Sequence, residues 1–270
     1  GALSADPRAP GQLWTATDAA FADTRILKIN ANRTPAMITS ELPVTKDGQQ
    51  ASYDVEGLWA ARDGFWLGVE GASGPDNLIV RTDLRGRVTD EILLPTEVSA
   101  ELGKQGIEGI TGSADGRTLT VALQRTAKGD PANTARIGRL DRQTGSWTWF
   151  LYPLSTTDVT GDWIGLSEIV TIDEDTVAVI ERDKLSGPAA KIKRIMAVDL
   201  PSAAPGSVTR VDKKLLRDVV PDLRRTNGWT TEKLEGLTVD ARGNWFAITD
   251  NDALKDNNGD TQFLRLGRLV

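Results

Sequence analysis

The sequence contains no cysteine and no histidine. Without cysteine, the chain has no disulfides, no thiolate nucleophile and no cysteine-ligated zinc or iron–sulfur site. Without histidine, a Ser-His-Asp triad, a histidine general base and every histidine-ligated metal site are excluded. Any bound metal must therefore be held by oxygen atoms, which favours Ca²⁺ and leaves Mg²⁺ as the second choice.

The chain is moderately acidic, with 32 lysine and arginine residues, 38 aspartate and glutamate residues and a net charge of −6. A nucleic-acid partner is not expected, because nucleic-acid-binding proteins usually carry a basic surplus. The sequence has no run of about 18 apolar residues, which a transmembrane helix needs, and residues 1–11 lack the apolar segment of a signal peptide. We therefore expect no transmembrane segment.

An internal repeat dominates the organisation of the chain. Glu-Gly followed by an aliphatic residue occurs as Glu56-Gly57-Leu58, Glu108-Gly109-Ile110 and Glu235-Gly236-Leu237. A fourth copy, Ser167-Glu168-Ile169, keeps the acid and the aliphatic residue but loses the glycine. The copies lie about 50 to 70 residues apart, which is somewhat more than the length of a four-stranded propeller blade.

Each copy is followed by a turn and then by a short alternating strand that ends in a polar residue. This arrangement is typical of a β-hairpin, so the polar residue should lie beside the leading glutamate. A third strand recurs in every unit, and a fourth in several, including Val208 to Val211 in the fourth unit. The N-terminal stretch shows the later strands of a unit but no evident first strand.

These five units predict a single all-β domain over residues 1–270, a β-propeller of four-stranded antiparallel blades. Closure into a ring protects the edges of such sheets. The number of blades, five or six, stays open, because the last unit ends after three strands and the first unit shows no strand before its second. The same gap predicts that the chain is an N-terminally shortened piece of a longer protein.

One segment departs from the strand pattern. Residues 213–223 carry Leu215, Leu216, Val219, Val220 and Leu223 at helical spacing, and Pro221 lies near the end of the segment. This periodicity predicts a helical insertion between the fourth and fifth units. The insertion is expected either to cover the mouth of the propeller or to pack on its rim.

The repeated acids are the candidate metal ligands. The first strand of each blade lines the channel of a propeller, so the leading glutamates should converge there with the acids that end the second strands. Clustered carboxylates repel one another and need a cation nearby. The predicted ligands of Ca²⁺ are Glu56, Glu70, Glu108, Glu168, Glu181, Glu235 and Asp250, with Asp18 as a further second-strand acid. Alternatively, the glutamates form ion pairs with arginine or lysine.

Basic residues near these acids are candidates for binding an anionic substrate. Arginine suits bidentate binding of phosphate or carboxylate. The predicted substrate-binding residues are Arg125, Lys191 and Lys233, and the predicted catalytic residues are Glu108, Glu168 and Arg182. One of the two glutamates would act as the base for a metal-bound water. Trp163 and Trp229 lie in loops ahead of leading glutamates and are the tryptophans expected to face a ligand.

The pattern resembles the family called esterase-like activity of phytase, a group of bacterial phytase-like propellers. The segments that carry the resemblance are Glu56-Gly57-Leu58, Gln105 to Ile110, Tyr152-Pro153-Leu154, Gly165 to Ile169, Ile180 to Asp183, Lys233 to Leu237 and Thr249 to Asp252. It spans the chain from about Leu13 to Leu266. The resemblance implies a propeller fold, a secreted or periplasmic location and a Ca²⁺-dependent esterase activity on phosphoric esters.

Three functions follow as hypotheses. The first is a Ca²⁺-dependent hydrolase of phosphate esters that acts on a small anionic ester as a monomer. The second is a lactonase or other carboxylic-ester hydrolase, and the third is a binding propeller whose acids hold a structural ion. The fold alone does not choose among them.

Overall fold

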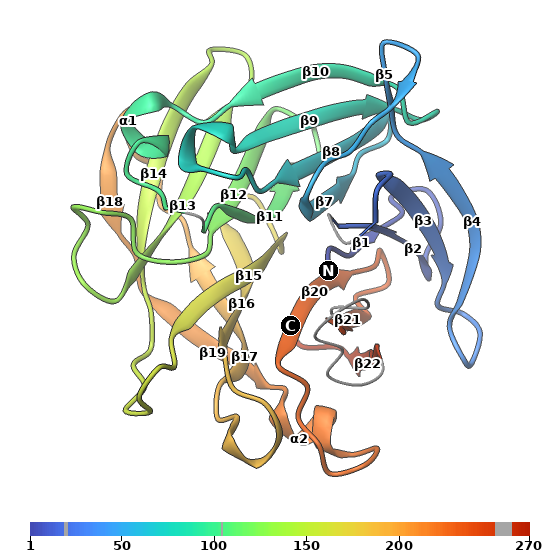
Figure 1. The fold of residues 1–270 in the computed structure, drawn as a ribbon, viewed down its shortest axis with the longest axis vertical. Helices are drawn as coiled ribbons and strands as arrows, with labels where there is room; N and C mark the ends of the chain where they lie inside the picture. Colours follow the sequence, from blue (N-terminus) through green and yellow to red (C-terminus); the bar gives the residue numbers. More distant parts are fainter. Residues whose placement is uncertain (19–20, 104, 252–260) are drawn as a thin grey trace.

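The computed structural model describes residues 1–18, 21–103, 105–251 and 261–270. Five small antiparallel sheets surround a central axis, and we number these blades one to five in chain order (Figure 1). Blade one contains β1 (Ser4–Ala5), β2 (Gln12–Ala16), β3 (Arg25–Asn30) and β4 (Met37–Pro43). Blade two contains β7 (Val55–Ala60), β8 (Gly64–Val69), β9 (Leu78–Asp83) and β10 (Val88–Leu93).

The other three blades follow the same order from the axis outward. Blade three contains β11 (Ile107–Gly112), β12 (Thr118–Leu123), β13 (Thr134–Asp141), β14 (Ser146–Pro153) and β18 (Val208–Arg210). Blade four contains β15 (Ile164–Thr171), β16 (Thr176–Asp183), β17 (Lys193–Asp199) and β19 (Lys213–Asp218). Within the described residues, blade five contains β20 (Lys233–Val239), β21 (Trp245–Asp250) and β22 (Phe263–Gly267).

Short elements connect the blades. They are the hairpin of β5 (Thr45–Lys46) and β6 (Gln49–Gln50), the 3₁₀ helices Gly74–Asp76 and Gly187–Ala189, and the helices α1 (Thr96–Ser99) and α2 (Val220–Arg224). None of the helices in the described ranges is long and apolar enough to cross a membrane.

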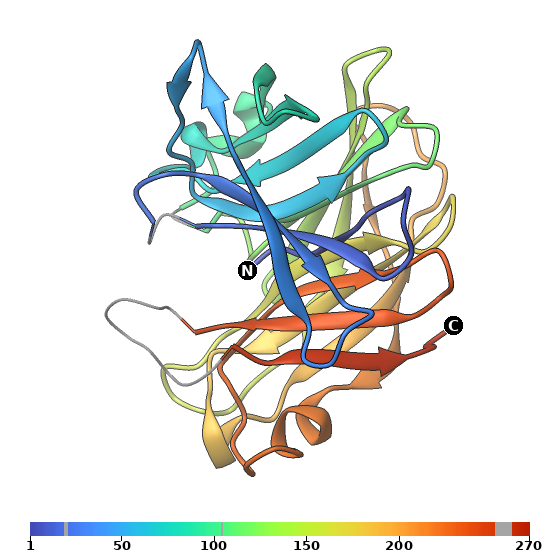
Figure 2. The same cartoon turned by 90° about the vertical axis from the view of Figure 1, so that its right-hand side faces the viewer.

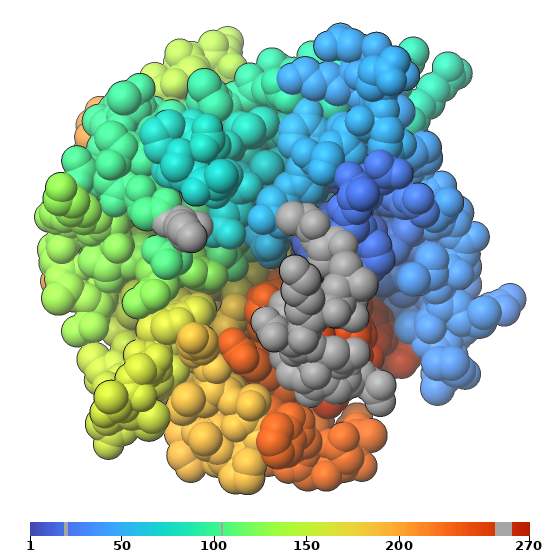
Figure 3. All heavy atoms as spheres, viewed as in Figure 1, coloured from blue at the N-terminus to red at the C-terminus, as the bar shows by residue number. Residues whose placement is uncertain are grey.

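The five innermost strands form a closed ring. β1 contacts β7, β7 contacts β11, β11 contacts β15, β15 contacts β20, and β20 contacts β1. The chain is therefore a five-bladed β-propeller, which confirms the predicted fold and decides between five and six blades. Figure 2 shows the blades from the side, and Figure 3 shows them following one another around the molecule in sequence order.

The prediction that blade one has no first strand was wrong. Ser4 pairs with Trp14 and Ala5 pairs with Leu13, so β1 is a first strand of two residues. Two residues are too few to show a period-2 pattern, which is why the sequence did not reveal the strand. Leu3, just before it, is 1% exposed, so this short segment contributes to the core.

The predicted helical insertion over 213–223 was also wrong for most of its length. β19 pairs antiparallel with β17 and completes blade four, and only Val220–Arg224 is helical. The open edge of β17 supplies backbone partners that local periodicity does not reveal. Pro221 lies in the first turn of α2, where its missing N–H costs nothing, so it begins the helix.

The strand predicted at Val208 to Val211 exists but belongs to another blade. β18 pairs parallel with β14 and extends blade three, not blade four. The chain therefore returns to the edge of blade three before it forms β19. Sequence periodicity indicates that a segment is extended, but it does not indicate which edge that segment joins.

Close contact between the inner strands depends on glycine. A Cβ added to Gly57 would lie 2.7 Å from the backbone nitrogen of Ile110, and one added to Gly109 would lie 2.6 Å from the nitrogen of Ile169. Such distances are too short for a side chain, so the repeated glycines allow neighbouring inner strands to meet at the axis. The apolar core fills the spaces between blades, with Trp245 and Phe150 fully buried.

Candidate active site at the mouth of the ring

The leading glutamates lie at β-bulges of the inner strands. The pairing of blades two, three and five skips Glu56, Glu108 and Glu235 respectively. A bulge leaves one residue unpaired and re-aims its side chain. Blade four has the same bulge, but the residue it skips is Ser167. Ser167 is thus the counterpart of the leading glutamates, and Glu168 occupies the place of the glycine that follows them.

The second strands end in a matching layer of residues. Gln124 pairs with Gly106, and its N–H donates to the Gly106 carbonyl at 3.1 Å. The corresponding residues in blades two, four and five are Glu70, Arg182 and Asp250. In blade four, therefore, the residue at this position is a cation and not the predicted Glu181.

Glu181 points to the opposite face of blade four, because adjacent residues in a strand alternate in direction. Its carboxylate accepts hydrogen bonds from Lys213 Nζ at 2.5 Å and from Ser155 Oγ at 2.6 Å. Tyr152 packs beside this pair, with Lys213 Nζ 4.9 Å from its ring centre. The structure therefore does not bring Glu181 together with the other predicted metal ligands.

Blade two supplies a compact group of three carboxylates. Oxygen atoms of Asp54, Glu56 and Glu70 lie within 4.8 Å of one another, and no other such group occurs among the described residues. Asp54 was not predicted, although its position two residues before Glu56 places both side chains on one face of an extended strand. Alternation around Glu56 is the sequence signal that could have found it.

The donor set of this group fits a hard divalent cation. All three ligands offer carboxylate oxygen, the type that Ca²⁺ prefers at 2.3–2.6 Å. Two oxygens that each lie about 2.4 Å from one ion are at most about 4.8 Å apart. The spacing in blade two is therefore compatible with a shared ion held by Asp54, Glu56 and Glu70.

The electrostatics of this group also favour a cation. Burial raises the pKa of Glu56 well above its ordinary value. The positive amino group of Gly1 lowers it, and the negative charges of Glu108 and Glu235 raise it. Burial also raises the pKa of Glu70, although the backbone N–H of Gly106 donates to its carboxylate at 2.9 Å. The charge of Lys233 lowers that pKa, and Lys233 pairs with Asp250 at the position that Asp54 occupies in blade two. A bound cation would stabilise the ionised form of each acid.

Glu108 lies between the acidic side and the basic side of the mouth. It is 4% exposed, and Gln124 Nε2 donates to its Oε1 at 2.6 Å. Burial and the negative charges of Glu235 and Glu70 raise its pKa, and the positive charge of Arg182 lowers it. The resulting pKa is about 8. The raised pKa favours the protonated form of Glu108, which makes it a candidate proton donor.

Arg182 is the buried cation of the mouth. It is 2% exposed, and its Nη2 donates to Glu235 Oε1 at 2.9 Å. Its Nε and Nη1 are buried without a hydrogen-bond partner among the described residues. The guanidinium carbon lies 5.3 Å from the ring centre of Trp163, and that of Arg125 lies 4.9 Å from the same ring. Trp163 thus joins two arginines on the side of the mouth opposite blade two.

Glu168 lies inside the ring and not in the group of three carboxylates. It is 1% exposed, and its two oxygens accept hydrogen bonds from the backbone N–H groups of Ile169 at 3.0 Å and Leu3 at 3.3 Å. Burial raises its pKa well above the ordinary value. Because Leu3 belongs to blade one, this side chain links two blades that are not neighbours.

The remaining predicted residues are spread around the mouth and the rim. The nitrogen of Gly1 lies 3.3 Å from Asp250 Oδ2, and Asp18 and Asp250 both line a groove between blades one and five. Lys191 is exposed near Pro188, away from the carboxylates, and Trp229 packs over Gly187. Asp252, part of the segment Thr249 to Asp252, lies outside the described residues.

Comparison with known proteins identifies the family. The phytase-like family, described as esterase-like activity of phytase, matches residues 1–253. The chain belongs to the phytase-like family. The prediction made from the repeated motifs is thereby confirmed for both family and fold. No curated protein matches the sequence.

Three solved structures are similar to this chain at low sequence identity. The major allergen Mala s 1 of Malassezia sympodialis is 10% identical, with 96% of this chain and 90% of the allergen covered and a TM-score of 0.47. A chain of the mitotic checkpoint complex is 12% identical, with a TM-score of 0.42. The match covers 99% of the present chain and 61% of that chain. The GH74 xyloglucanase of Xanthomonas campestris is 11% identical, with a TM-score of 0.39. The match covers 99% of the present chain and 47% of the xyloglucanase.

Proposed function

We propose that this phytase-like propeller is a Ca²⁺-dependent hydrolase of phosphate esters that acts at the mouth of its ring. The observation that carries the proposal is the opposition of charges across the mouth. Asp54, Glu56 and Glu70 offer oxygen ligands on one side, and Arg182 lies buried on the other side. A phosphate ester needs both, because its oxygens bind a cation and accept hydrogen bonds from arginine.

The three carboxylates of blade two would hold the cation, which would polarise a phosphoryl oxygen and bind the attacking water when present. Arg125 is half-buried beside Trp163 and would orient an anionic substrate from the opposite side. Lys233, close to Glu70, would add positive charge at the cation side of the substrate. In this proposal, Arg182 donates a hydrogen bond that holds the carboxylate of Glu235 in place, and it contributes positive charge from its buried position.

Glu108 would serve as the general acid. Burial is the main cause of its raised pKa and favours the protonated carboxyl group, and the hydrogen bond from Gln124 fixes its orientation. A protonated acid at this position would protonate the departing alkoxide as the P–O bond breaks. This role differs from the base predicted from sequence, and it follows from the buried surroundings of the side chain.

The activity is tested with protein that has been dialysed against EDTA. Hydrolysis of 4-nitrophenyl phosphate is measured without metal, with Ca²⁺ and with Mg²⁺, alongside a panel of lactones. We expect phosphatase activity that returns with Ca²⁺ and stays absent in EDTA. Turnover of lactones alone would replace the proposal with the lactonase hypothesis. If Ca²⁺ raises only the melting temperature, the protein is a binding propeller with a structural ion.

A monomeric state and a secreted or periplasmic location accompany this proposal as predictions. They follow from the family resemblance and from the size of the single ring, and they would be measured by light scattering and by fractionation of the source cells.

A further inference from the structure

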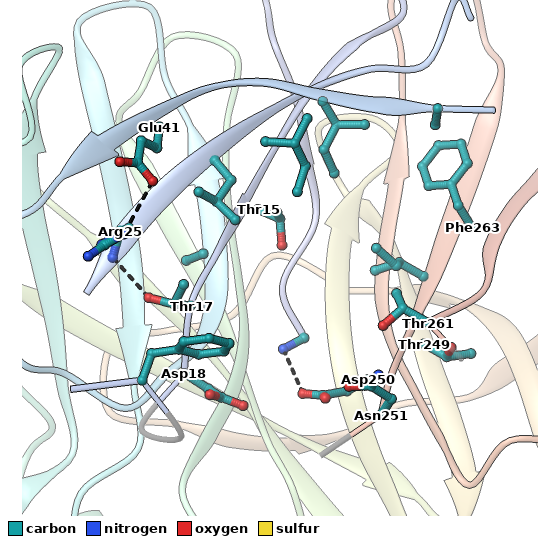
Figure 4. A pocket seen from close by; sticks show the side chains of 18 of the residues that line it. Thr15, Thr17, Asp18, Arg25, Glu41, Thr249, Asp250, Asn251, Thr261 and Phe263 are labelled. Carbon is teal, nitrogen blue, oxygen red and sulfur yellow. Dashed lines mark hydrogen bonds and ion pairs between the residues drawn. The ribbon is translucent and has the colours of Figure 1, made fainter. Parts of the chain in front are cut away.

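A groove lies between blades one and five, on the same face as the carboxylates. Figure 4 shows its lining, with β2, β3 and β4 on one side and β21 and β22 on the other. Its volume is about 630 Å³, within the range of pockets that bind small molecules. The groove is separate from the polar cavity at Arg125 and Trp163, which lies between blades three and four.

The walls of the groove are largely apolar. Leu27 and Ile29 of β3 alternate along the strand and face it, Ile38 of β4 extends the same surface, and Phe263 and Ile248 lie opposite. Ile38 is 61% exposed. Leu27, Ile248 and Phe263 are half-buried and continue the apolar surface inward from Ile38. A contiguous apolar surface that is open to water marks a binding surface.

The inner end of the groove meets the carboxylate mouth. Asp18 and Asp250 line this end together with Gly1, whose nitrogen lies 3.3 Å from Asp250 Oδ2. A Cβ added to Gly1 would lie 2.4 Å from Glu235 Cβ, so this residue of the groove lining also contacts a leading glutamate. An ester with its reacting group at the mouth could therefore extend its other end along the apolar walls.

The charges of the groove select against a second anionic group. Its lining includes Asp18, Asp23, Glu41 and Asp250, with Arg25 as the only lysine or arginine among the described lining residues. Arg25 already pairs with Glu41 at 3.3 Å and with Asp23 at 3.9 Å. A polyanion would meet like charges along this groove, whereas an uncharged hydrocarbon would bury apolar surface there.

We infer that the groove between blades one and five binds the apolar part of the substrate, so that the protein prefers monoesters with one aryl or alkyl group over polyphosphorylated polyols. This inference rests on the proposed function for the reaction itself, but binding in the groove is measurable without turnover. Burying one aromatic ring in such a groove should raise the affinity of an ester by roughly one order of magnitude over a small polar ester.

The first experiment measures binding alone. The neutral probe N-phenyl-1-naphthylamine becomes fluorescent in apolar surroundings, and it is titrated into the protein in EDTA. Ile38→Asn should weaken binding about tenfold, because it places an amide in the apolar wall. Leu93→Asn is the matched control, since Leu93 is 62% exposed on β10 and lies outside the groove. The fold of each variant is checked by its melting temperature.

The second experiment compares substrates. In Ile38→Asn, kcat/KM should fall about tenfold for 4-nitrophenyl phosphate and stay unchanged for glycerol phosphate. Equal probe binding by Ile38→Asn and Leu93→Asn would overturn the inference even if phosphatase activity is present. Probe binding that depends on Ile38 without any turnover would retain the groove as an apolar binding site and reject the proposed hydrolase. Faster turnover of inositol hexakisphosphate than of the aryl ester would also overturn it.

Discussion

Blades two and four place opposite chemistry on equivalent backbone positions. At the strand entry, the bulge and the end of the second strand, blade two carries Asp54, Glu56 and Glu70. Blade four carries Gly165, Ser167 and Arg182 at the same three positions. The two blades have the same strand order, so the fold fixes the positions and the sequence fixes the charge. A symmetric scaffold thereby acquires one side suited to a cation and another suited to an anion.

The largest effect should come from removing the cation of blade four. Arg182→Met leaves the carboxylate of Glu235 buried without its partner, and breaking a buried pair in this way costs about 3–5 kcal/mol. Urea denaturation in EDTA measures the loss of unfolding free energy. Arg182→Met combined with Glu235→Gln should recover much of the loss, because the second change removes the unpaired charge. No recovery in the double variant would show that packing on Trp163 is the main contribution of Arg182.

The next effect concerns the acids of blade two. Glu70→Gln should lower kcat for 4-nitrophenyl phosphate by about 100-fold at a fixed Ca²⁺ concentration, because one charged ligand is lost. Calorimetric titration of Ca²⁺ should show weaker binding, while stability in EDTA is unchanged or higher. Glu97→Gln, a change to an exposed acid on α1, is the control and should leave both measurements unchanged. Unchanged Ca²⁺ affinity in Glu70→Gln would remove blade two from the metal site.

The third prediction separates Glu168 from the metal ligands. Glu168→Gln should lower the free energy of unfolding by about 2 kcal/mol. The NH₂ group of the glutamine would face one of the two backbone N–H groups that now donate to the carboxyl oxygens, so that N–H would lose its acceptor. Its Ca²⁺ affinity should match that of the unchanged protein. The paired measurement is urea denaturation and calorimetry on one preparation. Weaker Ca²⁺ binding with full stability would return Glu168 to the ligand set.

The smallest effect is the pH dependence contributed by Glu108. Its folded pKa of about 8 lies above the ordinary value of 4.5, so the folded state binds more protons than the unfolded state between these values. Its stabilising contribution is therefore complete below about pH 4.5 and is lost as the pH rises to about 8. In EDTA, Glu108→Gln should flatten this decline by up to about 1.4 kcal/mol per pH unit, which is the slope that one extra bound proton gives. An unchanged slope would mean that other acids cause the decline.

Much of the fold was predictable because its signals are local and repeated. Turns, alternating strands and the recurring Glu-Gly motif predicted the propeller and the convergence of Glu56, Glu108 and Glu235 on one mouth. Partner choice between edges was not predictable, and this is why β18 and β19 were misplaced. β1 was missed for a different reason, because its two residues are too few to show a period-2 pattern.

Two errors in the site, those at Glu168 and Glu181, have one common physical cause. Glu168 and Glu181 are each displaced by one residue from the positions that face the mouth, and a shift of one residue in a strand reverses the direction of its side chain. In the sequence, Ser167-Glu168 resembles a degenerate copy of Glu-Gly, and Glu181 resembles Glu70. Only the bulge at Ser167 and the pairing of Gly165 with Arg182 establish the correct phase.

The sequence by itself determined which chemistry this protein has available. The absence of cysteine and histidine leaves oxygen ligands, and the repeated glutamates require counter-charge wherever they meet. The tertiary structure decided which of these acids meet, because bulges and strand register set the direction of each side chain. It joined Asp54 to Glu56 and Glu70, paired Arg182 with Glu235, turned Glu181 toward Lys213 and enclosed Glu168 within the ring.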